Sequence, residues 1–179
     1  MKESVYLIGC RAVGKSSIGR QLAQRLSYVY LDTDTMITEK HGQSVAEIVR
    51  EGGWQRFRAY EKEVLEELQN RRQCVVATGG GAIIHSKLWP HLKKQGNVIW
   101  LTAALDVLFS RIRADQQTDV LRPSLTGNDV CQELENILAE RSPLYKAAAD
   151  YTIDTGVMDI DSAVSKIEDF LQEPIHNRE

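Results

Sequence analysis

Gly9, Gly14, Lys15 and Ser16 stand in the octapeptide GCRAVGKS at a spacing that suits phosphate chemistry. The two glycines let the backbone turn so that successive N–H groups point inward, and Lys15 adds a mobile cation that can follow the β- and γ-phosphates of a nucleotide. The Ser16 hydroxyl is of the type that ligates Mg²⁺. We therefore predict a nucleotide-phosphate loop. Its expected nucleotide-binding residues are Arg11, Ala12, Val13, Gly14, Lys15, Ser16 and Ser17.

Two carboxylates, Asp32 and Asp34, follow a second apolar run. Ligands of open α/β sheets bind at the carboxyl ends of the strands, where this pair would lie. Asp32, next to the sheet, is expected to hold the metal through water together with Ser16, and Asp34 is expected to meet a substrate hydroxyl. The alternative is a solvated pair that starts a helix, with Thr33 or Asp34 as its N-cap.

Three successive glycines, Gly79, Gly80 and Gly81, come directly after a third apolar run. They have no side chains to obstruct a polyol, and their N–H groups can donate to one, which predicts close approach of a ligand to this backbone. A tight turn between a strand and a helix is the structural alternative. The third run lacks a terminal aspartate for Mg²⁺, so that role would pass to Asp32.

Arginines are the residues expected to hold an anionic substrate. Arg58 and Glu61 are three apart on one helical face, so the carboxylate can orient the guanidinium. Arg141 lies near the end of a helix that Pro143 is expected to stop. Arg122 precedes a proline in a polar stretch. Each arginine has a structural alternative. Arg58 and Glu61 could be a solvated surface pair, and Arg141 could be only a partner of the helix dipole. Arg122 could be a solvated loop arginine.

Composition limits the class of protein. With 179 residues, 42% of them apolar, the chain can form one domain with a sizeable core and has no room for a second full domain. A formal net charge of −3 argues against a general surface for nucleic acid or membranes. Three cysteines without metal spacing favour a reducing cytosol. Because no run of transmembrane length occurs and little sequence precedes the first apolar run, we expect a cytoplasmic protein.

Short β-type runs alternate with helical segments, which predicts a parallel sheet covered on both faces, an α/β fold. The expected strands are 5–8, 28–31, 74–77, 98–101 and 151–153. The expected helices are 15–26, 45–68, 86–94, 105–114, 130–148 and 160–171. Gly52 and Gly53 are expected to bend or split the second helix. Residues 115–128 are polar and contain Pro and Gly, which indicates a mobile flap.

The phosphate loop, LDTD, FRAYE, the triple glycine, LRPSL and ERSPLY occur in the order found in shikimate kinases, and the chain resembles that family over residues 4 to about 155, most closely in its type II form. The resemblance implies a P-loop NTPase-type three-layer sandwich with a five-stranded parallel sheet of order 2-3-1-4-5. It also implies ATP- and Mg²⁺-dependent phosphorylation of the 3-hydroxyl of shikimate, a step toward chorismate and aromatic amino acids.

The resemblance implies roles for individual residues as well. Arg58 and Arg141 would clamp the shikimate carboxylate, Asp34 and the three glycines would hold its hydroxyls, and Arg111 would stack on adenine. The catalytic residues would be Lys15, Asp34 and the flap arginine Arg122, which reaches ATP. We expect one kinase domain over residues 1–179, a substrate-binding region at about 33–61 and a mobile lid at about 112–127. We expect a monomer that binds neither nucleic acid nor membranes.

The chain departs from the family pattern at Ala12, where glycine is usual, and at Ser17, where threonine is common. The sequence is also compatible with two other functions. A related small-molecule kinase, such as a gluconate kinase, shares the loop and the overall fold, although the arginine pair and the triple glycine favour shikimate. A nucleotide-binding switch or regulatory module is the other, although the chain lacks the guanine-reading motif NKxD.

Overall fold

Five parallel strands form one sheet in the predicted order, β2-β3-β1-β4-β5. This computed structural model of the chain describes residues 3–114 and 130–173. Each strand lies within two residues of the position expected from sequence at both ends. The strands are β1 (Ser4–Ile8), β2 (Val29–Asp32), β3 (Cys74–Ala77), β4 (Gly96–Thr102) and β5 (Tyr151–Asp154).

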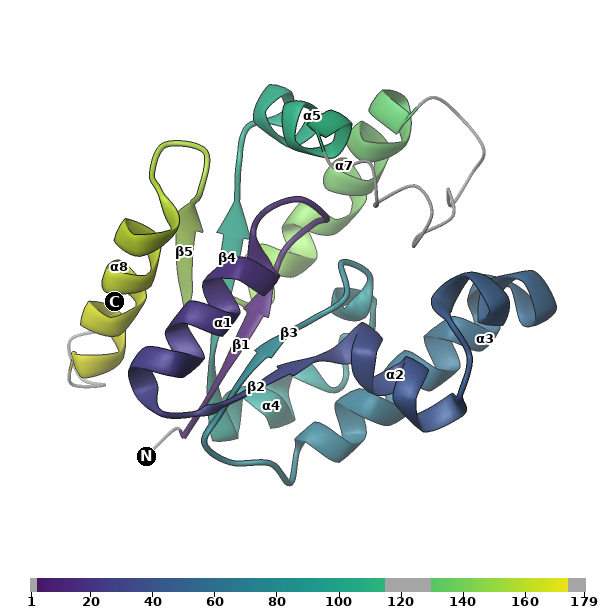
Figure 1. Cartoon of the computed structure of the whole chain (residues 1–179), viewed down its shortest axis with the longest axis horizontal. Helices are drawn as coiled ribbons and strands as arrows, with labels where there is room; N and C mark the ends of the chain where they lie inside the picture. Colours follow the sequence, from purple (N-terminus) through teal and green to yellow (C-terminus); the bar gives the residue numbers. More distant parts are fainter. Residues whose placement is uncertain (1–2, 115–129, 174–179) are drawn as a thin grey trace.

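Helices cover both faces of the sheet and complete the three layers of the predicted sandwich (Figure 1). One face packs against α1 (Lys15–Leu26), α5 (Leu105–Ala114) and α8 (Ile160–Gln172). The other packs against α2 (Thr33–His41), α3 (Val45–Leu68) and α4 (Trp89–Gln95). α7 (Val130–Ala148) contributes to both layers, with Leu134 in the first and Tyr145 in the second. Successive residues of a strand point to opposite faces, so Val5 and Leu7 of β1 join the first layer while Tyr6 and Ile8 join the second. No helix within the described ranges has the length and apolar composition of a membrane span.

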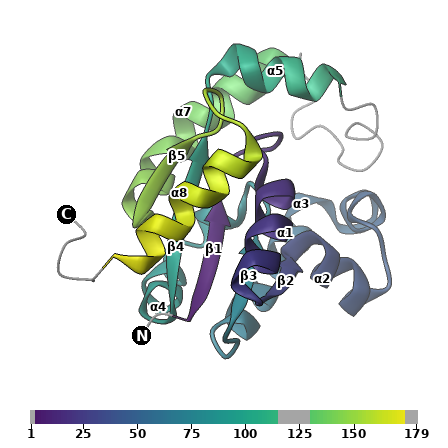
Figure 2. The same ribbon diagram turned by 60° about the vertical axis from the view of Figure 1, so that its left-hand side comes forward.

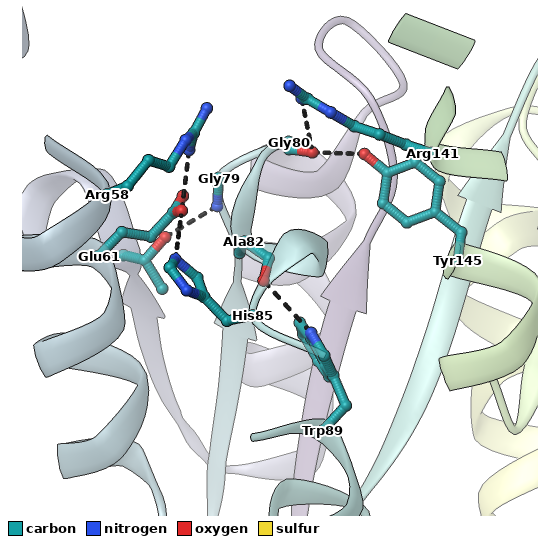
Figure 3. A network of polar contacts seen from close by, with 10 residues as sticks. Arg58, Glu61, Gly79, Gly80, Ala82, His85, Trp89, Arg141 and Tyr145 are labelled. Carbon is teal, nitrogen blue, oxygen red and sulfur yellow. Dashed lines mark hydrogen bonds and ion pairs between the residues drawn. The ribbon is translucent and has the colours of Figure 1, made fainter. Parts of the chain in front are cut away.

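α3 shows how local sequence sets the position of a later side chain. The helix begins with a capping box, in which the Glu47 N–H donates to Ser44 Oγ and the Ser44 N–H donates to the Glu47 carboxylate. The predicted break is present at Gly53, whose φ of 65° and ψ of −179° interrupt the helical backbone. After the break Phe57 is buried, and the next residue, Arg58, faces the carboxyl edge of the sheet (Figure 3).

α2 was not among the predicted helices. It begins directly after β2, and its N-cap is Asp32, which accepts hydrogen bonds from the N–H groups of Asp34 (3.0 Å) and Thr35 (3.4 Å). The alternative interpretation, in which the two carboxylates start a helix, is thus correct about the helix but wrong about its cap, which is Asp32 and neither Thr33 nor Asp34. The helix was missed because its apolar positions are few and do not make a clear periodic pattern, so the cap carries the local signal.

α7 has the bounds expected from its apolar spacing, 130–148, but the separate expectation that Pro143 stops this helix is wrong. The helix continues through the proline to Ala148. A proline inside a helix costs about 3 kcal/mol. The last turn is held by tertiary contacts, because the buried Tyr145 ring stacks on Trp100 and its hydroxyl donates to the carbonyl of Gly80. In α4, by contrast, a proline at Pro90 lies in the first turn, where the missing N–H is harmless, and the helix begins at Trp89 instead of 86.

The carboxyl ends of the strands point toward the region between α5 and the α2–α3 pair, as Figure 1 and Figure 2 show. The predicted site residues that the structure describes lie at the end of β2 or in the chain segments that follow β1, β2, β3 and β4. The fold therefore gathers them from distant parts of the sequence, as expected for a doubly wound parallel sheet.

Candidate active site

The phosphate loop turns sharply between β1 and α1. Gly9 and Gly14 have φ values of 137° and 97°, and Gly14 is the N-cap of α1. At Gly9 a side-chain carbon would also overlap the backbone carbonyl of Leu101 in β4, so the turn requires glycine there. Lys15 is 7% exposed, and its ammonium donates to the carbonyls of Gly9 (2.8 Å) and Cys10 (2.6 Å). The predicted loop and its lysine are therefore in place at the N-terminus of the first helix.

Ala12, the departure from the usual glycine, has a φ of 61°. A left-handed backbone costs an alanine about 1–2 kcal/mol, which glycine avoids, although glycine also gains entropy in the unfolded chain. We expect Ala12→Gly to raise the free energy of unfolding by up to about 1 kcal/mol, measured by urea denaturation at equal m-values. A variant that is less stable than the parent chain would contradict this explanation of the departure.

A cavity of about 560 Å³ lies beside the loop. Residues 11–18 form one wall, so all seven loop residues predicted to bind nucleotide, including the exposed Ser17, line it. Asp32 and Arg111 reach the same cavity from β2 and α5. A helix N-terminus with a glycine-turned loop and a lysine favours anions, and this cavity is large enough for a nucleotide.

Ser16 and Asp32, the predicted metal pair, lie next to each other, with the Ser16 hydroxyl 3.4 Å from Asp32 Oδ2. The Tyr30 hydroxyl donates to the same oxygen at 3.3 Å, while Oδ1 caps α2. Asp32 therefore both caps the helix and presents oxygen to the cavity. Hard oxygen donors of this type fit Mg²⁺. No cluster of three or more His, Cys, Asp and Glu side chains that would hold a transition metal occurs in the described parts of the chain.

Arg58 and Glu61 form the predicted ion pair, with 2.8 Å between Nη1 and Oε2 (Figure 3). The Glu61 side chain is fully buried, and its Oε2 also lies 3.1 Å from Nε2 of His85. The guanidinium of Arg58 lies 5.5 Å from the ring centre of Trp54 and 5.3 Å from that of Phe57. A buried carboxylate and two aromatic rings thus fix the direction of this arginine, which excludes the alternative of a solvated surface pair.

The three glycines make room for protein side chains. A side-chain carbon on Gly81 would overlap the guanidinium of Arg58, and one on Gly79 would lie 2.8 Å from Glu61 Oε1 and 2.9 Å from Asp34 Oδ1. The Gly79 N–H donates to Thr33 Oγ1 at 2.8 Å, so this amide is engaged within the protein, contrary to the expectation that it donates to a ligand. A side-chain carbon on Gly80 would lie 3.5–3.6 Å from backbone atoms of the phosphate loop. The triple glycine and the phosphate loop are therefore adjacent.

Arg141 of α7 reaches the same glycines from the other side, as Figure 3 shows. Its Nη1 donates to the Gly80 carbonyl at 3.2 Å, and the Tyr145 hydroxyl donates to that carbonyl at 2.5 Å. Burial raises the pKa of Tyr145 well above its usual range, so the hydroxyl keeps its proton and remains a donor. Arg58 and Arg141, which are 83 positions apart in the sequence, therefore both lie against the dipeptide Gly80-Gly81.

Arg111 lies beside the nucleotide cavity. Its Nη2 donates to the carbonyl of Thr155 (2.6 Å), and its Nη1 donates to Thr155 Oγ1 (3.0 Å) and the carbonyl of Ala12 (3.4 Å). The guanidinium is thus held at the rim of the phosphate loop. Arg122 and most of the predicted lid, at about 112–127, lie outside the described residues.

Three contributors to this site were missed from the sequence. His85 and Tyr145 had no spacing signal that tied them to Glu61 or Gly80. Thr155 had a weak signal, because it is a polar residue directly after the last strand, at the edge where ligands bind.

The glycine-turned loop at the start of the first helix, the sheet order and the lysine beside a nucleotide-sized cavity define a phosphate-loop kinase fold. The profile of the family described as "Shikimate kinase" matches residues 11–172. The chain belongs to the shikimate kinase family, whose members are phosphotransferases with an alcohol group as acceptor.

Individual relatives agree with this assignment. "Shikimate kinase 2" of Yersinia enterocolitica is 39% identical over 154 residues, which cover 86% of this chain and 87% of the relative. "Shikimate kinase" of Nitratidesulfovibrio vulgaris is 39% identical over 149 residues, covering 83% and 85%. The structure of shikimate kinase from Acinetobacter baumannii in complex with shikimate superposes with a TM-score of 0.86 and 34% identity, covering 94% of this chain and 92% of that one. The predicted family and fold are confirmed.

Proposed function

We propose that this chain transfers the γ-phosphoryl group of ATP to the 3-hydroxyl of shikimate and releases shikimate 3-phosphate and ADP. The observation that carries the proposal is the convergence of Arg58 and Arg141 on Gly80 and Gly81, directly beside the phosphate loop. Planar guanidinium groups bind a carboxylate through paired hydrogen bonds, which a lysine cannot do. In a chain with a net charge of −3, this local pair supplies the charge that a small anionic polyol needs.

In the proposed arrangement, the carboxylate of shikimate lies between the two arginines. Asp34, next to Gly79, then accepts a hydrogen bond from the reacting hydroxyl and takes its proton as the oxygen attacks the γ-phosphorus. The bond from phosphorus to the β,γ-bridging oxygen breaks, and the negative charge stays with ADP. Lys15 follows the phosphates and stabilises this charge, which is the main catalytic requirement of phosphoryl transfer.

Ser16 and Asp32 would hold Mg²⁺, Ser16 directly and Asp32 through water, and the ion would neutralise charge on the β- and γ-phosphates when bound. Their adjacent oxygens fit this role. We also propose that Arg111 contacts the adenine, that Arg122 reaches ATP, and that the lid at about 112–127 excludes water. These assignments follow from the family resemblance.

We further propose one kinase domain in residues 1–179, with 33–61 as its substrate-binding region, that acts as a cytoplasmic monomer on small molecules in the pathway to chorismate and aromatic amino acids. The free, buried thiols of Cys10 and Cys74 support a reducing compartment. The acidic net charge supports the absence of nucleic-acid and membrane partners.

A coupled assay of ADP release tests this function, with shikimate, quinate and gluconate compared at equal concentrations in the presence of ATP and Mg²⁺. We expect fast turnover with shikimate and slow turnover with the other two acids. Preference for gluconate would indicate a related sugar-acid kinase instead. ADP release that none of the three accelerates would indicate a nucleotide-binding module without transfer activity.

Gly81→Ala tests the position of Arg58 without removing it. Because the added methyl group would overlap the guanidinium, the arginine must move, and we expect the KM for shikimate to rise by about tenfold or more, the value of a displaced charge-assisted hydrogen bond. The KM for ATP should stay within about twofold. In an Arg58→Ala background, Gly81→Ala should have little further effect. Equal effects in both backgrounds would show that Gly81 acts independently of Arg58.

A further inference from the structure

Thr155 joins four segments that are distant in the sequence. It follows β5 directly and is 4% exposed. Its hydroxyl lies 2.9 Å from the carbonyl of Val13 in the phosphate loop and 3.2 Å from that of Thr102 at the end of β4. Nη1 of Arg111 in α5 donates to it at 3.0 Å. This buried hydroxyl is therefore a meeting point of the loop, the sheet edge and α5.

The donor and acceptor capacity of the Thr155 hydroxyl determines which hydrogen bonds it can make. A threonine hydroxyl has one proton and two acceptor lone pairs, so it accepts from Arg111 and donates to one carbonyl, of which Val13 is the nearer. Arg111 also donates to the carbonyl of Ala12 at 3.4 Å. Two successive carbonyls of the phosphate loop, those of residues 12 and 13, are thus held from the same side by Thr155 and Arg111.

Holding these carbonyls also fixes the next N–H groups. In a trans peptide the C=O and the following N–H point in opposite directions, and the described chain contains no cis peptide bond. The N–H groups of Val13 and Gly14 are therefore directed away from Thr155 and Arg111. Successive backbone N–H groups of this kind are the donors that a phosphate uses in such a loop. Ala12 is held in a left-handed conformation that an alanine rarely adopts, which surrounding contacts must maintain.

We propose that Thr155 is a positioning residue for the nucleotide, which keeps the phosphate loop and Arg111 in their binding geometry through the carbonyl of Val13 and the guanidinium of Arg111. The inference rests on the proposed use of the loop for ATP but not on the identity of the acceptor. The hydroxyl of Thr155 bonds to the phosphate loop, to the end of β4 and to Arg111, whereas Arg58 bonds to Glu61 and Arg141 bonds to Gly80. Thr155 therefore belongs to the nucleotide half of the site and not to the half that holds the two arginines. Loss of its hydroxyl should therefore affect nucleotide binding and spare shikimate binding.

The test compares Thr155→Val, which keeps the shape and removes the hydroxyl, with Thr155→Ser, which keeps the hydroxyl. Calorimetric titration of each full-length variant with ADP and, separately, with shikimate measures the two affinities. We expect Thr155→Val to raise the Kd for ADP about tenfold, in line with one or two lost hydrogen bonds, and Thr155→Ser to stay within about twofold. The Kd for shikimate should stay within about twofold in both variants.

Ser4→Ala is the matched control, because Ser4 is also a buried hydroxyl that donates to a backbone carbonyl, that of Arg71, but it lies at the opposite end of β1. It should leave the Kd for ADP unchanged. If Thr155→Val does not fold, Thr155→Ala replaces it with the same expectation. Failure of both to fold while Thr155→Ser folds would make Thr155 a residue of the core and overturn the proposal.

Unchanged ADP affinity in Thr155→Val, or an equal loss of ADP and shikimate affinity, would also overturn the proposal. Failure of the Thr155 proposal can be distinguished from failure of the proposed function. If the proposed function is wrong, the parent chain will show no ADP release that depends on shikimate, whatever the effect of Thr155→Val on ADP binding.

Discussion

Replacing Asp34 by asparagine is expected to lower kcat for shikimate phosphorylation by about a hundredfold or more, while the KM values for shikimate and ATP change much less. The amide keeps the shape of the side chain and loses the capacity to accept a proton from the reacting hydroxyl, and general-base catalysis contributes about 10²–10⁴-fold. Asp34 follows the cap of α2 and lies beside Gly79, at the edge of the proposed shikimate site.

The control for this variant must exclude a defect in the fold, since Asp34 lies in the first turn of α2. Asp32 is the helix cap, so the helix should survive Asp34→Asn, and the far-ultraviolet circular dichroism and melting temperature should stay close to those of the parent chain. A pre-steady-state burst experiment would separate chemistry from product release. Near-normal kcat in Asp34→Asn would remove the catalytic role and leave Asp34 as a helix residue.

Arg58→Ala and Arg141→Ala are each expected to raise the KM for shikimate by roughly tenfold to a hundredfold. Each variant removes charge-assisted hydrogen bonds to one carboxylate, worth about 1.5–3 kcal/mol. Steady-state kinetics with each substrate varied in turn would measure the effect, and the KM for ATP should stay nearly unchanged. The two variants act on the same group from α3 and α7, so their effects should not add fully in the double variant.

Two further variants sharpen this test. Arg58→Lys should recover little of the lost affinity, because an ammonium group cannot replace the planar fork that Glu61 orients. Arg56→Ala is the matched control on the same helix, since Arg56 pairs with the exposed Glu51 and the Tyr60 hydroxyl, away from the glycines. It should leave the KM for shikimate unchanged. A KM within about twofold in both Arg58→Ala and Arg141→Ala would show that the clamp is assigned wrongly.

The parallel sheet was predictable from the sequence because each strand is a short β-branched or aromatic run that alternates with a helical segment, whereas the order of the strands came from the family resemblance. The sequence also predicted the break at Gly53 and the pairing of Arg58 with Glu61, both of which are local patterns. The phosphate loop was predictable for the same reason, since all of its chemistry lies within eight residues. Features that depend on residues within a few positions of one another could therefore be predicted from the sequence.

Features that depend on tertiary contacts were not accessible in this way. The apolar spacing predicted the full length of α7, but Pro143 should end a helix by its local chemistry, and the contact of the buried Tyr145 with Gly80 explains how the helix tolerates it. His85 and Thr155 join the site through contacts over 24 and 142 positions of sequence, respectively, which no spacing rule reveals. The family resemblance supplied roles for Arg58 and Arg141, but the structure shows that the glycines bring them together.

The most direct test of the central claim is identification of the phosphorylated product. The purified chain is incubated with ATP, Mg²⁺ and shikimate, and the mixture is analysed by ³¹P nuclear magnetic resonance with proton coupling. We predict one phosphomonoester signal coupled to the proton on C3 of shikimate, in an amount equal to the ADP formed. ADP formed together with free phosphate alone, or a phosphomonoester on another hydroxyl, would contradict the account.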